Sequence, residues 1–438
     1  MSAPDFSVDV FQNEYLPDGG REVNAIVTVA SSGAAGVAGA GVTDARADGG
    51  GGAAEIIIID CSGSMSSPMA KMISARQATA AATDAIRDGV AFAVIAGTNQ
   101  AVPAFPRDGS LIIANAATRA DAKLALSGLQ PNGGTAIGEW LRLAHRMFQT
   151  HPATLRHAIL LTDGKNEHES SLRLAAAIAL CEGQFSCDCR GVGTDWVVDE
   201  LRKVATGLLG TVDIVPDPAG LAADFQAMMA AAMAKEVADV MLRVWTPQHA
   251  SVRFVRQVAP AVEDLTARRT PSGAQASDYP TGAWGTESRD YHICVDVDPA
   301  GIGQEMLAAR VSLIAAAASG SQTLGTGLVR AIWTDDEALS TRLSSHVAHY
   351  TGQAELAEVI QEGLEARKFG DEHTASLKLG RAVALAHESG NEDTARLLAK
   401  VVDVIDPETG TVRLKASVGA ADEMALDTRS SKTVRVKK

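Results

Sequence analysis

The spacing of apolar residues changes along the chain, and each change marks a different kind of structure. In residues 1–30, apolar and polar positions alternate on both sides of a turn at YLPDGGRE (15–22), which predicts β-strands. From 54 to 235, short runs of almost purely apolar residues alternate with longer stretches of helical periodicity. Because uninterrupted apolar runs indicate strands buried on both faces, this region predicts an α/β, Rossmann-like domain with a mostly parallel sheet and helices on both sides.

The β pattern returns after this region. Five apolar stretches between 236 and 335 have strand character and predict an antiparallel β-sandwich. The strands of 1–30 need partners for their edges, so we expect them to join this sandwich. The α/β domain would then be inserted between strands of the sandwich, after a flexible Gly- and Ala-rich linker at 31–53.

The remainder of the chain is predicted to be helical and then mobile. Residues 336–403 have apolar residues at three- and four-residue spacing, with Gly352, Gly370 and Gly390 at expected helix breaks. They predict a small helical bundle. The last segment, 404–438, ends in the basic sequence KTVRVKK and is expected to be a mobile tail.

Charge and cysteine content narrow the function classes. The 438 residues carry a formal net charge of −14, which argues against a nucleic-acid binder or a protein of anionic membranes. The sequence shows no export signal and no apolar run of about 18 residues. We therefore expect a cytoplasmic protein in which the five cysteines are reduced thiols.

Oxygen-bearing side chains gather where predicted strands end. IIIIDCSGSM (56–65) places Asp60, Ser62 and Ser64 directly after a buried strand. Thr135 follows two glycines at the start of a predicted helix, and Asp163 ends a second buried strand in LLTDGKN. Ligands of open parallel sheets bind outside the carboxyl ends of the strands. These five side chains therefore predict one binding site.

Hydroxyl and carboxylate oxygens suit a hard divalent cation such as Mg²⁺, with Mn²⁺ or Ca²⁺ as alternatives. Two carboxylates and three hydroxyls leave such an ion incompletely neutralised, so that it can accept one more carboxylate from outside. The alternative is structural: Ser62 caps a helix and Asp60 caps a turn. The joint occurrence with Thr135 and Asp163 favours the metal site.

The pattern DxSGS, then Thr in a glycine-rich loop, then Asp in a TDG turn resembles the metal-ion-dependent adhesion site of von Willebrand factor A (VWA) domains. The resemblance covers about 55–235. It implies that Ser62 and Ser64 contact the metal directly and that Asp60 acts through water. It also implies that Thr135 and Asp163 alternate between direct and water-mediated contact, and that a partner's Asp or Glu completes the coordination.

Beyond that domain, the β-sandwich and the helical C-terminal region resemble those of bacterial, actinobacterial-like cytoplasmic VWA proteins, including ones similar to tellurium-resistance VWA proteins, and so do stretches such as QNEYLPDGGREVNAIVTV (12–29) and CDCRGVGTDW (187–196). This resemblance implies a part in signalling or stress response and suggests a Ser/Thr kinase, a phosphatase or a forkhead-associated protein as a partner. Ser430, Ser431 and Thr433 in the basic tail are candidate phosphorylation sites, Thr433 above all, although a plain solvated tail is the simpler interpretation.

Other chemistries have weaker support. Cys181, Cys187 and Cys189 lack the fourth ligand of a structural zinc site, so we expect buried or unreactive thiols. No GxSxG or phosphate-binding loop is present, and His145, His151, His157 and His168 are expected on the surface or on helix faces.

The sequence therefore favours a non-enzymatic, Mg²⁺-dependent protein-interaction scaffold. The alternative is an accessory subunit of an AAA+ ATPase of the MoxR or chelatase type. A metal-dependent hydrolase is the least favoured candidate, since no general base is evident beside the site.

Overall fold

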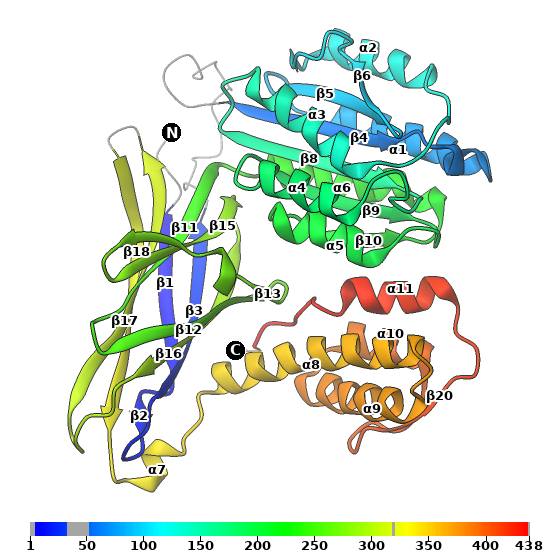
Figure 1. Ribbon diagram of the computed structural model, residues 1–438. Helices are drawn as coiled ribbons and strands as arrows, with labels where there is room; N and C mark the ends of the chain where they lie inside the picture. Colours follow the sequence, from blue (N-terminus) through cyan, green and yellow to red (C-terminus); the bar gives the residue numbers. More distant parts are fainter. Residues whose placement is uncertain (1–4, 33–51, 318–319, 437–438) are drawn as a thin grey trace, which may run out of the picture. The chain divides into compact units, whose positions relative to one another are not determined.

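The computed structural model describes residues 5–32, 52–317 and 320–436. The chain divides into two units (Figure 1): Met1–Gly36 together with Val237–Lys438, and Val37–Glu236. Since both ends of the chain build the first unit, the second unit is an insertion. Most of the predicted linker, residues 33–51, lies outside the described residues.

The inserted unit is an α/β domain built on one sheet with the strand order β10-β9-β8-β4-β5-β6, and β7 also pairs with β5. β4 lies at the centre and pairs in parallel with both β5 and β8. The strands are β4 (Ala53–Asp60), β5 (Ala91–Gly97), β6 (Ala101–Phe105), β7 (Ile112–Ile113), β8 (Leu155–Thr162), β9 (Ser186–Val192) and β10 (Val212–Val215).

Helices cover both faces of this sheet (Figure 1). Side chains of successive strand residues point to opposite faces, so Ile57 and Ile59 pack in the core beneath α1 and α6 while Ile56 and Ile58 are buried on the other side. The helices are α1 (Ala70–Ala85), α2 (Ala116–Ser127), α3 (Ile137–Gln149), α4 (Ser171–Cys181), α5 (Val198–Gly207) and α6 (Leu221–Met233).

The sheet is not wholly parallel. β6 and β7 pair antiparallel with β5, and the sequence pattern did not predict either of them. β6 contains Pro103, which has no backbone N–H to donate, and β6 lies at the end of the strand order, where proline is tolerated. The proline therefore weakens the sequence signal of a strand that the fold accepts at its edge.

The β-sandwich consists of two sheets with the orders β1-β3-β16-β12-β13 and β14-β15-β11-β17-β18-β2. β3 pairs with β16, so the N-terminal strands are part of the sandwich, as the sequence predicts. One apolar core, which includes Trp284 and Trp333, lies between the sheets. The strands are β1 (Asp5–Gln12), β2 (Tyr15–Leu16), β3 (Glu22–Ser32), β11 (Val237–Trp245), β12 (Ala250–Ala259), β13 (Glu263–Asp264), β14 (Thr270–Gly273), β15 (Ala276–Trp284), β16 (Ser288–Val297), β17 (Glu305–Ala317) and β18 (Gly320–Trp333).

The helical region begins with α7 (Glu337–Ser340) and continues with α8 (Ser345–Lys368), α9 (Glu372–Ser389) and α10 (Glu392–Val401). Gly370 and Gly390 have φ angles of +78° and +66° and end their helices, as predicted. Gly352 does not: it lies inside α8, because the apolar spacing continues through it and the helix packs on α9. Within the described residues, no helix is both long and apolar enough to cross a bilayer.

The prediction of a mobile tail over 404–438 is wrong for 404–436, and residues 437–438 lie outside the described residues. β19 (Val402–Asp406) and β20 (Thr411–Leu414) form a hairpin, and α11 (Ala420–Arg429) follows. The hairpin turn approaches α9 closely, since a Cβ on Gly410 would lie 2.3 Å from the carbonyl oxygen of Gly380. Packing on α9 and α10 supplies order that the polar composition of this segment does not indicate.

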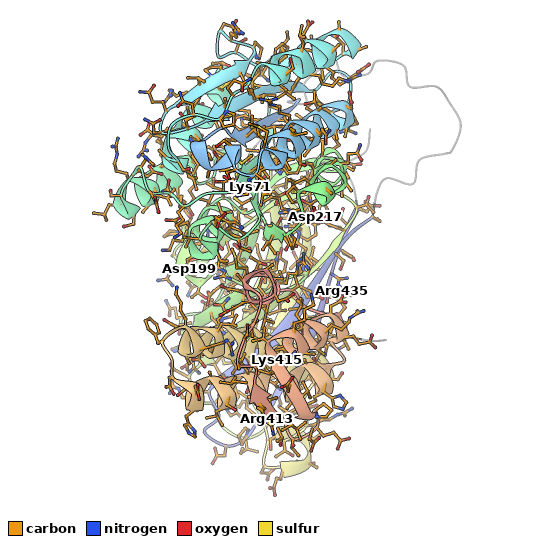
Figure 2. All side chains as sticks on the ribbon, turned by 90° about the vertical axis from the view of Figure 1, so that its right-hand side faces the viewer. Lys71, Asp199, Asp217, Arg413, Lys415 and Arg435 are labelled. Atoms are coloured by element: carbon orange, nitrogen blue, oxygen red, sulfur yellow. The ribbon has the colours of Figure 1, made fainter. Side chains whose placement is uncertain are left out.

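The residues after α11 attach to the sandwich. Val262 N–H donates to Ser431 O at 2.7 Å, and Thr433 N–H donates to Pro260 O at 3.1 Å. The Thr433 hydroxyl, the candidate phosphorylation site, donates to the backbone oxygen of Val258 at 2.7 Å. Arg435, labelled in Figure 2, has its Nε 3.7 Å from the Oδ2 of Asp290. The segment 431–436, called the strap below, is therefore held against the sandwich by these contacts.

Truncation after Ser430 is expected to lower the unfolding midpoint by roughly 4–8 °C, because it removes these hydrogen bonds and uncovers the apolar cluster that Val436 packs against. Thermal unfolding followed by circular dichroism measures this effect. As a control, Lys368→Ala changes an exposed side chain at the end of α8, outside this segment. An unchanged midpoint in the truncated protein would show that the strap adds no stability.

Candidate functional site

The five predicted residues meet at the carboxyl ends of the two central strands. Asp60 is the last residue of β4, and Asp163 directly follows β8. The two strands are neighbours, with Ile59 opposite Leu161, so their loops leave the sheet side by side. The chain runs from β4 to β5 on one side and reaches β8 on the other. This reversal of strand order is where ligands of open α/β sheets bind.

The side chain of Asp60 accepts hydrogen bonds that fix the loop after β4, the first loop of the site. Its Oδ1 accepts the backbone N–H of Ser62 at 2.7 Å, and its Oδ2 accepts the hydroxyl of Thr162 at 2.5 Å. The side chain is fully buried, and burial raises the pKa of Asp60 to about 6 in spite of these hydrogen bonds. A cation placed near this carboxylate would offset the cost of burying its charge.

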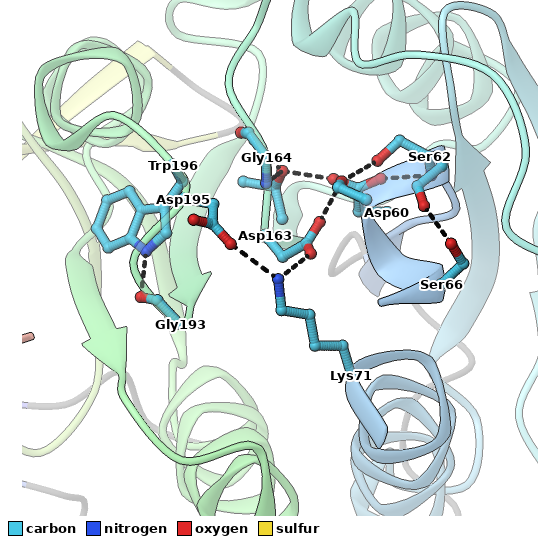
Figure 3. A network of polar contacts seen from close by, with 12 residues as sticks. Asp60, Ser62, Ser66, Lys71, Asp163, Gly164, Gly193, Asp195 and Trp196 are labelled. Carbon is cyan, nitrogen blue, oxygen red and sulfur yellow. Dashed lines mark hydrogen bonds and ion pairs between the residues drawn. The ribbon is translucent and has the colours of Figure 1, made fainter. Parts of the chain in front are cut away.

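The serine hydroxyls lie between the two loops. Ser62 Oγ and Ser64 Oγ are 2.9 Å apart, and the Ser64 hydroxyl donates to Asp163 Oδ1 at 2.6 Å. Asp163 is completely buried and Ser62 is 2% exposed, whereas Ser64 is exposed. Figure 3 shows Asp60, Ser62 and Asp163 joined in this network of polar contacts. The site is therefore closed at its base and open at Ser64.

Thr135 reaches the site on a glycine-rich loop. Gly63 N–H donates to Gly133 O at 2.9 Å, which fastens this loop to the first one, and Gly133 adopts φ +75°. His168 holds Thr135 by two hydrogen bonds. The backbone N–H of Thr135 donates to His168 Nδ1 at 3.2 Å, and the backbone N–H of His168 donates to the backbone oxygen of Thr135 at 3.1 Å. No spacing or motif around His168 predicts this contact.

The hydroxyls converge on one point in a cavity of about 360 Å³. A Cβ added to Gly164 would lie 3.0 Å from Ser64 Oγ, 3.2 Å from Thr135 Oγ1 and 3.9 Å from Ser62 Oγ. Only the absence of a side chain at Gly164 keeps this space free. Three hydroxyl oxygens around one point, with two carboxylates beside them, are a donor set that fits Mg²⁺.

The described residues contain no group of three or more His, Cys, Asp or Glu side chains arranged to bind a metal. The donor set predicted here is of another kind, since only two of its five members are carboxylates and the other three are hydroxyls. The absence of such a group from the described residues also gives no support to a zinc site at Cys181, Cys187 and Cys189, which are buried free thiols. Burial raises the pKa of Cys181 to about 12, which makes this thiol unreactive.

Lys71 is a member of the site that the sequence did not identify. Its Nζ lies 2.8 Å from Asp163 Oδ2 and 3.1 Å from Asp195 Oδ2 (Figure 3). Lys71 comes from the first turn of α1, and Asp195 from the loop after β9. The one signal that could have identified Lys71 is its position as a lone lysine in PMAKMIS, a segment otherwise of apolar and small residues close to the DxSGS motif.

The prediction for the histidines is wrong for His157. This residue of β8 has a side chain that is only 13% exposed, with its Nδ1 2.8 Å from Glu55 Oε2 and its Nε2 3.0 Å from Asp188 Oδ2. Glu55 and Asp188 belong to the strands on either side, so the three residues form a largely buried ionic cluster on the sheet. The cluster lies on strand residues that precede the site loops.

Comparison with known protein families gives matches to two separate parts of the chain. The family model of the von Willebrand factor type A domain matches residues 54–214, and that of the von Willebrand factor type A C-terminal domain matches 384–430. The second match includes α11, in the segment that the sequence predicted to be mobile. No curated protein matches the chain by sequence.

Solved structures also match over nearly the full length of the chain. A von Willebrand factor type A protein from Catenulispora acidiphila is 52% identical, and the match covers 99% of this chain and 98% of that one with a TM-score of 0.92. The ArnB paralogue VWA2 from Sulfolobus acidocaldarius is 13% identical, covers 97% and 98%, and has a TM-score of 0.60, which shows a shared fold. The chain belongs to the von Willebrand factor type A family.

Proposed function

We propose that the protein is a non-enzymatic scaffold that binds a partner protein through Mg²⁺. Ser62, Ser64 and Thr135 would hold the ion directly, with Asp60 and Asp163 behind them as balancing carboxylates. The ion would supply a positive charge with one position for an Asp or Glu carboxylate of the partner. The observation that carries the proposal is the convergence of the three hydroxyls on the space beside Gly164.

The arrangement favours binding over catalysis. Both carboxylates are already engaged: Asp60 accepts two hydrogen bonds, and Asp163 accepts from Ser64 and Lys71. The hydrogen bond from Thr135 N–H to His168 Nδ1 occupies the lone pair that a general base would use. What this set of side chains can do is hold a cation rigidly and leave one side of it accessible.

The proposed setting is the cytoplasm of a bacterium, in signalling or stress response. All five cysteines are free thiols, which is consistent with a reducing compartment. The domains around the metal site would present it or bind a second partner. An AAA+ ATPase as the captured partner would favour the accessory-subunit alternative, and a kinase, phosphatase or forkhead-associated protein would favour a signalling scaffold.

The test is capture of the partner from a lysate of the same organism, in Mg²⁺ and in EDTA, with identification by mass spectrometry. The double variant Ser62→Ala, Ser64→Ala is expected to retain nothing that wild type retains only in Mg²⁺, because it removes two of the three hydroxyl oxygens. Ser66→Ala is a matched control, since Ser66 lies in the same loop but donates its hydroxyl to Gly63 O at 2.7 Å.

Calorimetric titration with Mg²⁺ accompanies the capture, and the double variant should bind the ion at least roughly 100-fold more weakly than wild type does. Equal capture by wild type and the double variant, with and without EDTA, would contradict the proposal.

A further inference from the structure

The site contains a cation of its own. The ammonium group of Lys71 donates to Asp163 Oδ2 at 2.8 Å and to Asp195 Oδ2 at 3.1 Å. Lys71 is 7% exposed and Asp163 is completely buried, so water screens this pair weakly. The side chain of Asp195 is 70% exposed, and its contribution is screened more strongly. Figure 3 shows the ammonium between the two carboxylates.

Lys71 is charged at neutral pH. An ammonium group held between two carboxylates keeps its proton, because both acceptors stabilise the charged form. The ammonium therefore cancels one of the two negative charges, on Asp60 and Asp163, that back the proposed Mg²⁺ position. The oxygens of Asp163 are also divided, since Oδ1 accepts from Ser64 and Oδ2 from Lys71.

We propose that Lys71 is a tethered cation that weakens metal binding in the free protein and thereby makes metal and partner carboxylate bind together. The inference rests on the proposed function and adds a determinant of its specificity. Lys71 repels a divalent ion but attracts a carboxylate, so it acts on the two ligands with opposite sign. Because coupling is reciprocal, a carboxylate that improves Mg²⁺ binding is itself bound better when Mg²⁺ is present.

This charge distribution has a consequence for partner choice. With Mg²⁺ bound, the ion, Lys71, Asp60 and Asp163 carry a net charge of +1, part of which the exposed carboxylate of Asp195 offsets; removing Lys71 lowers the charge of the site by one. A neutral ligand, such as a hydroxyl or an amide, gains little from the extra charge, whereas a carboxylate gains the full Coulomb term. Lys71 therefore favours an acidic side chain over neutral oxygen ligands at the open position.

Calorimetric titration of the full chain with Mg²⁺ tests the inference, in 100 mM sodium acetate as the carboxylate probe and in 100 mM sodium chloride as the reference. In chloride, Lys71→Met is expected to bind Mg²⁺ roughly tenfold more tightly than wild type, since a like charge has been removed near the ion. Lys71→Arg keeps the charge and should bind like wild type. Acetate should improve Mg²⁺ binding more in wild type than in Lys71→Met.

Lys165→Met is the matched control, because Lys165 lines the same cavity but is exposed, and its removal should change the Mg²⁺ affinity by less than about threefold. Asp195→Asn is a second probe that does not disturb the buried pair with Asp163. It removes part of the charge that neutralises Lys71, so Mg²⁺ binding should weaken several-fold.

Two failures are distinguishable. If neither wild type nor Lys71→Met binds Mg²⁺, the proposed function itself fails. If wild type binds Mg²⁺ while Lys71→Met binds it equally or more weakly, and Asp195→Asn binds like wild type, the role of Lys71 is overturned and the metal site stands. Thermal unfolding of each variant establishes that it is folded, and Asp195→Asn decides the question if Lys71→Met does not fold.

Discussion

Replacing Gly164 with alanine is expected to abolish Mg²⁺ binding while the α/β unit stays folded. The added methyl group would lie 3.0 Å from Ser64 Oγ and 3.2 Å from Thr135 Oγ1, in the space that the ion is proposed to fill. No ligand is removed, and the backbone of Gly164 is not in the left-handed region, so alanine is compatible with its conformation. Calorimetric titration should show at least roughly a 100-fold loss of affinity.

The control for this variant is Gly128→Ala at the end of α2. Gly128 has φ −84°, and a Cβ there would be 3.5 Å from Ala125 O, an ordinary contact distance outside the site. This variant should bind Mg²⁺ like wild type. Full Mg²⁺ affinity in Gly164→Ala would mean that the ion does not occupy the space between the hydroxyls.

The second large effect concerns stability. His157→Leu is expected to lower the free energy of unfolding at pH 7 by about 3 kcal/mol, because it leaves the buried Glu55 and the half-buried Asp188 without their shared cation. Asp188 also accepts from the backbone N–H and the hydroxyl of Thr211, so it remains committed to the ionised form. Urea unfolding monitored by circular dichroism measures the loss.

The pH dependence of this difference has a definite sign. Burial alone would lower the pKa of His157, but the two carboxylates overcome burial and raise it to about 10. A raised pKa stabilises the folded state fully below the unfolded value of about 6.5, and this stabilisation disappears as the pH rises through the folded value. The difference between wild type and His157→Leu should therefore shrink steadily from pH 7 to pH 10.

His151→Gln is the control for the pH series, since His151 lies outside this ionic cluster, in the loop after α3. It should show no change in relative stability over the same range. A difference between wild type and His157→Leu that is constant from pH 6 to pH 10 would mean that His157 is neutral and that the cluster is held by hydrogen bonds alone.

Much of the fold follows from local patterns. Apolar runs such as IIIID and AILL are long enough to require burial on both faces, and the helices between them carry clear periodicity. The five site residues were predictable for a similar reason: each stands at the end of such a run or at a helix start, and the strand ends of a parallel sheet share one edge. Local sequence and sheet geometry agree at these positions.

The residues that were missed depend on distant parts of the chain. Lys71 belongs to the site because it contacts Asp163 and Asp195, which lie in the loops after β8 and β9. His157 belongs to an ionic cluster because it contacts Glu55 and Asp188 on the neighbouring strands. No local spacing relates these residues. The strap is a similar case, because Thr433 is ordered through backbone groups of the sandwich and not through its own neighbours in sequence.

Because the α/β unit is inserted between strands of the sandwich, the ribosome synthesises β1 and β3 first, then the whole α/β unit, and then the remaining sandwich strands. Ala30 of β3 can pair with Ser288 of β16 only after the whole inserted unit has been synthesised. The unit can fold first, since its own pairings lie between Ala53 and Val215. Until β16 emerges, β1 and β3 are a hairpin without a sheet, and such apolar edges associate readily with other chains. Slow synthesis between the two halves of the sandwich would therefore favour aggregation of the nascent chain, and fast synthesis would protect it.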